Sequence, residues 1–234
     1  MSTDPVSTGP VSSSPNGTDS GRPQHTRSLD VRPAGRSAVL VTLPTLDDVL
    51  ALRAGLAAAE LPGVTELVTG ARTVLVRYDP DRTGPAELGT RLQAVEPLPP
   101  TRAAAGEPVT IPVVYDGPDL DAVAAHAGLS RRGLVAWHTG QLWTSAFCGF
   151  APGFSYCTGD AGALDVPRRP TSRTTVPAGS VALADAFSAV YPRSSPGGWQ
   201  LIGRTEAVLW SLDRDPPALL PAGTRLRYVE VGAL

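Results

Sequence analysis

Hydrophobic residues in the first half of the chain follow two regular spacings in turn. The aliphatic and β-branched run at residues 37–43 (SAVLVTL) predicts a strand. In residues 44–61 the apolar side chains recur at helical spacing, and Asp47 and Asp48 stand in the first predicted turn, where the helix dipole favours acidic groups. We therefore expect a strand followed by a helix.

The next hydrophobic segments continue the same small unit. Residues 63–80 predict two strands joined by a turn at Gly70, and residues 85–97 predict a second helix. The order strand, helix, strand, strand, helix is typical of a two-layer α/β unit. We therefore expect a small ferredoxin-like α/β domain over residues 35–96.

The second half has short hydrophobic runs separated by proline and glycine turns. A dense apolar run at residues 109–117 predicts a strand buried on both faces. Two short helices should follow, broken at Gly128, with Ser130 capping the second. Further strands are predicted at residues 142–150, 176–184, 199–205, 206–212 and 224–231. Many short strands with frequent turns are typical of a β-barrel or sandwich.

Two segments fit neither unit. Residues 1–34 carry few large apolar side chains and cannot offset their ordering entropy, so we expect a disordered tail there. Residues 97–108 (PLPPTRAAAGEP) have the composition of a linker. The expected fold class is α+β, with the second domain occupying residues 109–234.

Composition excludes several kinds of function. The formal net charge is −2, which gives no overall field for nucleic acid or an anionic membrane. All 20 basic residues are arginine, so this sequence has neither a Schiff-base lysine nor a P-loop lysine. No run approaches the roughly 18 apolar residues of a membrane span, and no secretory signal is visible. With only two cysteines, Cys148 and Cys157, we expect a cytoplasmic protein with reduced thiols and no metal site.

Three blocks rich in glycine and proline concentrate the candidate chemistry. They read FCGFAPGFSYCTG from residue 147, RTTVPAGSV from residue 173 and YPRSSPGGWQLIGRT from residue 191. Glycine and proline dictate the backbone path, and the neighbouring aromatic, arginine and hydroxyl side chains supply recognition groups. The blocks predict a pocket wall, although the first could equally be a barrel corner filled with aromatic residues.

Individual residues support two kinds of site. His138 is either a pocket base or a histidine favoured by a helix C-terminus. Arg168, Arg169 and Arg173 are the best anion-binding candidates, the alternative being a solvated surface run. The VPAGSV and SPGGW turns could form anion-binding concavities of backbone N–H groups. No spacing singles out a Ser/His/Asp triad or a cysteine nucleophile, and the catalytic residues are not identified.

Taken in order, the motifs GFAPGFSY, PRR, VPAGSV, YP, SPGGW and LIGRT resemble the signature of the KipI/PxpB family. This family is also described as allophanate hydrolase subunit 1 or the carboxyltransferase C/D domain. The resemblance implies a cyclophilin-like β-barrel after the small α/β domain. It also implies a substrate- or anion-binding pocket formed by His138, Gly149, Phe150, Pro152, Gly153, Tyr156, Arg168, Arg169, Arg173, Pro177, Gly179, Ser180, Tyr191, Pro192, Ser195, Pro196, Gly197, Gly198, Trp199 and Arg204.

The resemblance implies three functional contexts. The leading one is membership of an ATP-dependent 5-oxoprolinase that cleaves 5-oxo-L-proline to L-glutamate, together with a sister carboxyltransferase-like subunit (the relative of allophanate hydrolase subunit 2) and a third, barrel-type subunit. The alternatives are urea carboxylase or allophanate hydrolase subunit 1, and a non-enzymatic inhibitor of a sporulation-type histidine kinase. In the first context the chain works within an assembly that uses ATP. The segment Phe187–Val190 departs from the polar string usual in the family.

Overall fold

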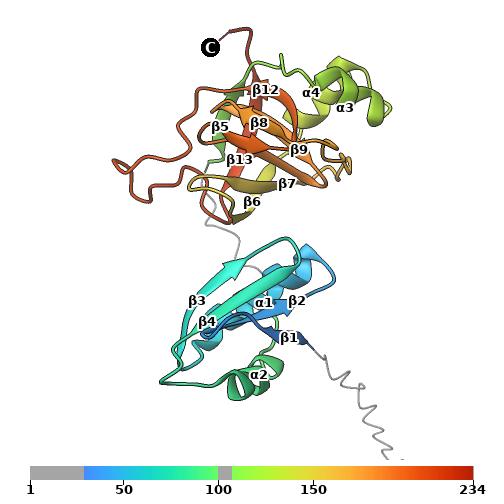
Figure 1. Ribbon diagram of the computed structural model, residues 1–234. Helices are drawn as coiled ribbons and strands as arrows, with labels where there is room; N and C mark the ends of the chain where they lie inside the picture. The colour runs from blue at the N-terminus through green and yellow to red at the C-terminus, as the bar shows by residue number, and fades with distance from the viewer. Residues whose placement is uncertain (1–28, 100–106, 234) are drawn as a thin grey trace, which may run out of the picture.

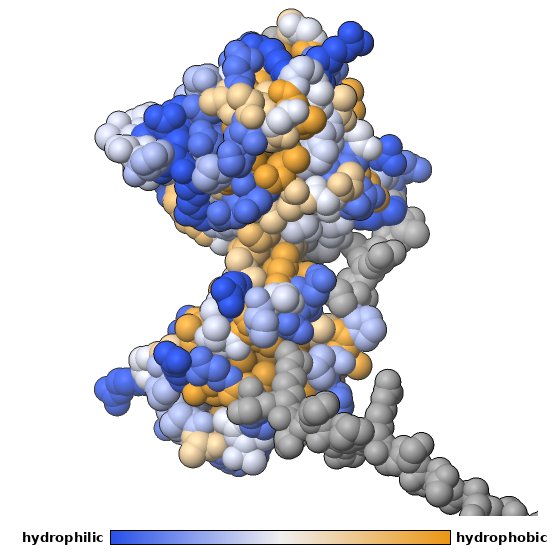
Figure 2. Space-filling model, turned by 90° about the vertical axis from the view of Figure 1, so that its right-hand side faces the viewer, coloured by the Kyte–Doolittle hydropathy of each residue, from blue (hydrophilic) through white to orange (hydrophobic). Residues whose placement is uncertain are grey.

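The computed structural model describes residues 29–99 and 107–233 of the chain, which form two lobes (Figure 1). Each lobe contains its own β-sheet and its own cluster of buried hydrophobic side chains. The space-filling view shows the two lobes meeting at a narrow waist where hydrophobic residues reach the surface (Figure 2). The fold is therefore mixed α/β.

The N-terminal lobe is a four-stranded antiparallel sheet with two helices. The strand order is β1-β2-β4-β3. Its elements are β1 (Asp30–Pro33), β2 (Ala38–Thr42), α1 (Leu46–Ala59), β3 (Val64–Thr69), β4 (Thr73–Tyr78) and α2 (Pro85–Gln93). Every strand and helix predicted for this part of the chain is present.

Local chemistry explains where the first helix begins. The Thr45 hydroxyl accepts a hydrogen bond from the Asp48 backbone N–H at 3.2 Å, which satisfies one of the helix's free donors. The helix buries Val49, Leu52 and Leu56 against the sheet. One boundary differs from expectation, because residues 30–33 of the expected tail pair with β2 as strand β1. Residues 1–28 of that tail lie outside the described residues.

The C-terminal lobe is built on a seven-stranded, barrel-like sheet with the order β12-β9-β10-β7-β6-β13-β5. A two-stranded sheet of β11 and β8 lies beside it. The strands are β5 (Val109–Val113), β6 (Trp143–Cys148), β7 (Ser155–Gly159), β8 (Arg173–Val176), β9 (Ser180–Ala184), β10 (Phe187–Val190), β11 (Ser195–Gly197), β12 (Gln200–Arg204) and β13 (Arg225–Glu230).

Two short helices connect β5 to β6. They are α3 (Leu120–His126) and α4 (Arg131–Thr139), and Gly128 separates them with a positive φ of 66°. The Ser130 hydroxyl accepts the Gly133 N–H at 3.0 Å, which confirms the predicted cap. Among the described residues, no helix is long and apolar enough to cross a bilayer.

Two expectations for strands in this lobe were wrong: the burial of β5 on both faces, and a strand at residues 206–212. Burial in β5 alternates, with Ile111 and Val113 buried and Thr110 exposed, so only one face packs against the core. Residues 206–212 make only an isolated bridge, from Trp210 to Ala218, because this segment lies outside the sheet. The sequence also did not reveal β7, β8, β10 and β11, whose pairing partners lie elsewhere in the chain.

Candidate functional site

Aromatic rings from the first and third glycine- and proline-rich blocks gather on one side of the barrel. Phe154 makes edge contacts with Tyr191 and Trp199, at centroid separations of 5.2 and 5.5 Å. The ring centroids of Tyr156 and Trp199 are 5.5 Å apart. The Arg168 guanidinium carbon sits 5.8 Å from the centre of the Trp199 ring, a cation–π arrangement. We call these five residues the aromatic–arginine face.

The loop that carries Phe154 depends on glycine. Gly153 has a φ of 81°, and a Cβ there would approach the Trp210 Cβ at 2.9 Å. Phe150 also takes a positive φ, of 66°, and its side chain is 61% exposed. Its ring contacts those of Phe154 and Tyr191 at the outer edge of the aromatic–arginine face. The loop is thus a tight corner that also presents an exposed aromatic ring.

Arg168 is the arginine of this face that is free to meet a ligand. Its only ion pair among the described residues is a long one, 3.8 Å to Asp185, and both side chains are more than half exposed. Burial raises the pKa of Tyr156, and the charge of Arg168 partly offsets that rise. The face therefore places a solvent-accessible cation at the edge of a buried aromatic cluster, in which Phe154 and Tyr191 are 1% exposed and Trp199 is 4% exposed. An exposed arginine of this kind can bind a small carboxylate.

Arg169 and Arg173 have a different setting. Both donate to one oxygen of Asp119, at 3.0 and 2.8 Å, and its other oxygen accepts the Leu201 N–H at 2.7 Å. The Asp119 side chain is only 7% exposed. This arrangement, which we call the Asp119 clamp, links the start of α3 to β12 and to residues 167–173, which carry the two arginines. Sequence reasoning missed it, because the only local signal is an acid at a helix start and the two arginines follow 50 and 54 residues later.

Arg204 and His138 have partners of their own outside the aromatic–arginine face. Arg204 pairs with Asp116 at 2.8 Å on the surface. His138 is fully buried, and its ring nitrogens contact the Tyr115 hydroxyl at 2.7 Å and the Ser188 hydroxyl at 2.9 Å. Burial lowers the pKa of His138 to about 3, so the ring is neutral. His138 is therefore part of the hydrogen-bonded, packed interior of the barrel.

The VPAGSV turn uses its own backbone donors. The Gly179 N–H donates to the Tyr191 carbonyl at 2.8 Å, and both the N–H and the hydroxyl of Ser180 donate to the Pro177 carbonyl. In the first block the Gly149 N–H donates to the Phe154 carbonyl at 3.2 Å. These N–H groups are therefore not available as a cradle for a phosphate.

The SPGGW turn packs tightly beneath Tyr191. A Cβ on Gly197 would overlap the Tyr191 hydroxyl, and one on Gly198 would lie 2.9 Å from the Ser172 hydroxyl oxygen. The Ser195 hydroxyl is buried without a hydrogen-bond partner among the described residues. The remaining candidates, Pro152, Pro177, Pro192 and Pro196, belong to the same turns. Within the described residues no three metal-binding side chains cluster.

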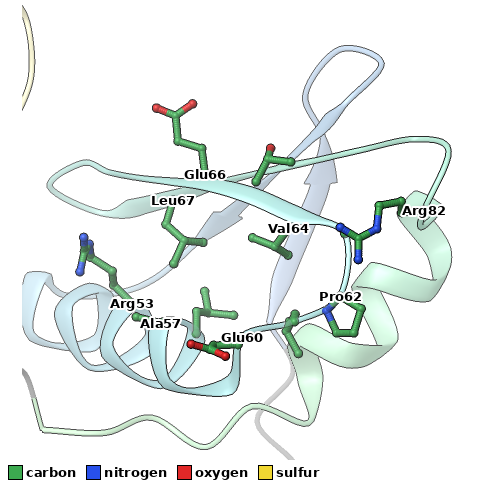
Figure 3. Close-up of a pocket in the computed structure, with 12 residues that line it drawn as sticks. Arg53, Ala57, Glu60, Pro62, Val64, Glu66, Leu67 and Arg82 are labelled. Carbon is green, nitrogen blue, oxygen red and sulfur yellow. The ribbon is translucent and has the colours of Figure 1, made fainter.

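A cleft of about 500 Å³ lies elsewhere, on the N-terminal lobe between α1 and β3. Figure 3 shows Val64 and Leu67 pointing from β3 toward Ala57 on α1, with Arg53 and Arg82 at its two ends. None of the residues proposed for the pocket lines this cleft. The sequence motifs and this hollow therefore mark different parts of the molecule.

Comparison with known proteins gives a consistent relationship. Residues 29–220 match the family model described as carboxyltransferase domain, subdomain C and D. The chain is 40% identical over 181 residues to the 5-oxoprolinase subunit designated B of Escherichia coli O157:H7, covering 73% of this chain and 79% of that protein.

Two solved structures extend the comparison. The crystal structure of TTHA0988 is 32% identical with a TM-score of 0.67, and the match covers 84% of this chain but 40% of that one. Urea amidolyase from Kluyveromyces lactis is 17% identical with a TM-score of 0.69, covering 87% of this chain and 15% of that one. The second likeness concerns the fold alone.

Proposed function

This chain belongs to the carboxyltransferase family of subdomains C and D, and we propose that it is the PxpB-type subunit of a cytoplasmic, ATP-dependent 5-oxoprolinase. Such an assembly cleaves 5-oxo-L-proline to L-glutamate. The observation that carries the proposal is the 40% identity to the Escherichia coli 5-oxoprolinase subunit over 79% of that protein. The urea alternative rests on the likeness to urea amidolyase at 17% identity, which concerns the fold alone.

The aromatic–arginine face fits the chemistry of this substrate. 5-Oxoproline carries a carboxylate on a small, nearly flat lactam ring. In this proposal Arg168 binds the carboxylate, and the ring packs against the partly exposed Tyr156 beside it. Arg169 and Arg173 hold the surrounding segment in place through the Asp119 clamp.

Three backbone N–H groups of the glycine turns are not free to bind the phosphates of ATP. The N–H groups of Gly149, Gly179 and Ser180 already donate to backbone carbonyls, and the sequence offers no lysine for the phosphates. We therefore assign the nucleotide to another member of the assembly. The partners in the proposal are the sister carboxyltransferase-like subunit, which we call the sister subunit, and the third, barrel-type subunit.

The same family membership supports a finer fold assignment. In it, residues 35–96 form a ferredoxin-like domain and residues 109–234 a cyclophilin-like barrel. Superposition of an experimental structure on members of both fold groups is the test. A barrel whose strand order differs from that of cyclophilins would overturn the assignment.

Reconstitution of the assembly tests the function. The chain is co-expressed with the proteins encoded beside it, and ATP-dependent release of glutamate from 5-oxoproline is measured. We expect activity only when this chain is present. Arg168→Ala should lower kcat/KM by about tenfold to a hundredfold, because a charged contact to the substrate is lost.

Arg77→Ala is the matched control, because Arg77 is similarly exposed and pairs with the surface carboxylate of Glu66 on the N-terminal lobe. It should keep activity within about twofold. Full activity of the assembly without this chain would overturn the proposed function.

A further inference from the structure

We propose that the segment between β12 and β13, residues 206–218, is the docking surface for the sister subunit. The partner surface it fits is an apolar groove with a basic rim. This inference rests on the proposed function, because the occupant it names is the sister subunit. Figure 1 shows the connection between β12 and β13 projecting from the barrel.

Hydrophobic side chains are exposed on this segment to an unusual degree. Leu212 is 83% exposed, Val208 59% and Trp210 40%. They account for three of the seven large hydrophobic residues that are exposed in the described part of the chain. Single exposed apolar residues are ordinary, but several in one short segment mark an interaction site.

Hydrogen bonds within the segment hold its backbone in one conformation. The Ser211 N–H donates to the Pro217 carbonyl at 3.0 Å, and the Leu219 N–H donates to the Leu209 carbonyl at 2.9 Å. The Arg214 guanidinium donates to the Val208 carbonyl at 3.0 Å. Leu209 anchors the segment, with its side chain 2% exposed. A surface held in shape before binding loses less entropy when a partner arrives.

Charge identifies the chemistry of the partner. Glu206, Asp213 and Asp215 flank the apolar residues along the chain, are exposed, and have no ion pair among the described residues. Arg214 is the one basic residue of the segment, and it binds backbone carbonyls. Three acidic groups against one basic group leave the segment with a net charge of −2. A basic rim on the partner would complement it.

The segment adjoins the aromatic–arginine face. A Cβ on Gly153 would lie 2.9 Å from the Trp210 Cβ, and Phe150 on the same loop is 61% exposed. A partner seated on residues 206–218 would therefore reach the edge of the proposed substrate site.

Isothermal titration calorimetry between the purified full chain and the purified sister subunit tests the inference. Leu212→Asp should raise Kd at least about tenfold, because it puts a charge into an apolar contact. The double variant Glu206→Lys with Asp213→Lys should also raise Kd, and raised salt should weaken wild-type binding. Val68→Asp, at an exposed valine of the N-terminal lobe, is the control and should change Kd less than about twofold.

Each outcome decides the matter. Wild-type affinity in Leu212→Asp and in the charge-reversal variant overturns the docking surface, and so does absence of binding by the wild-type chain. Glutamate release by the co-expressed assembly is scored separately. An inactive assembly that still depends on Leu212 for binding would overturn the proposed function and leave the docking surface standing.

Discussion

At the scale of single residues, the barrel interior contains a cluster of hydrogen-bonded polar side chains around His138. The His138 ring stacks on Tyr228 at 4.2 Å and contacts the hydroxyls of Tyr115 and Ser188. Ser188 donates in turn to the Tyr228 hydroxyl at 3.2 Å. Burial raises the pKa of both tyrosines, so the network is neutral. Each of these polar groups has a partner, which is the condition for burying it at low cost.

The buried histidine makes stability depend on pH. The pKa of His138 falls from 6.5 to about 3 on folding, so the unfolded chain binds more protons between these values. Its contribution is complete above pH 6.5 and is lost as pH falls toward 3, by about 1.4 kcal/mol per pH unit. Subtracting the urea-unfolding curve of His138→Gln from that of the wild type should isolate this slope. Parallel pH profiles for the two proteins would contradict it.

The Asp119 clamp predicts a large cost for removing one carboxylate. Asp119→Ala leaves two arginines and the Leu201 N–H without their acceptor, and should lower the free energy of unfolding by about 3 kcal/mol. Asp116→Ala removes an exposed pair with Arg204 and should cost less than about 1 kcal/mol. Equal losses in denaturant unfolding would show that the clamp is not structural.

At the scale of elements, the turns between strands fix how the barrel closes. Gly179 lies between β8 and β9 with a φ of 78°, and its carbonyl accepts the Thr205 N–H at 2.9 Å. A Cβ at this position would overlap the Thr205 carbonyl oxygen. Glycine is therefore required at position 179 for two reasons: its positive φ and the close approach of the Thr205 backbone.

Two glycines with nearly the same φ separate these effects. Gly35 has a φ of 76°, and a Cβ there would meet nothing within 4 Å. Gly35→Ala should cost about 1 kcal/mol, the conformational term alone. Gly179→Ala should cost clearly more, about 3 kcal/mol, because overlap is added. Thermal unfolding of both variants provides the measurement, and equal shifts in Tm would rule out the close approach.

At the scale of the whole molecule, the two lobes have separate hydrophobic cores. Leu52 belongs to the cluster of the N-terminal lobe and Leu226 to that of the barrel, and the two clusters share no residue. Both side chains are fully buried. A substitution in one core can therefore destabilise that lobe and leave the core of the other lobe intact.

Calorimetry can detect this independence. Leu52→Ala and Leu226→Ala should each destabilise one lobe by about 3 kcal/mol, because each leaves a cavity in one core. We expect each variant to lower one thermal transition and leave the other in place. A single transition that both variants lower equally would mean that the lobes unfold together.

Regular spacing and ordered motifs are what the sequence by itself determined. Residues 44–61 predicted α1, Ser130 predicted a helix cap, and the motif order from GFAPGFSY to LIGRT identified the family, because each depends only on neighbours along the chain. Prediction failed at β7 and β10, whose strands form through pairing with distant partners.

Only the tertiary structure sorted the candidate residues by role. It placed Arg168 beside Trp199, joined Arg169 and Arg173 to Asp119, and buried His138 inside the barrel. The linear sequence presents all of these as similar polar side chains near glycine and proline. Their roles differ because burial and charge pairing depend on groups that come together only when the chain folds.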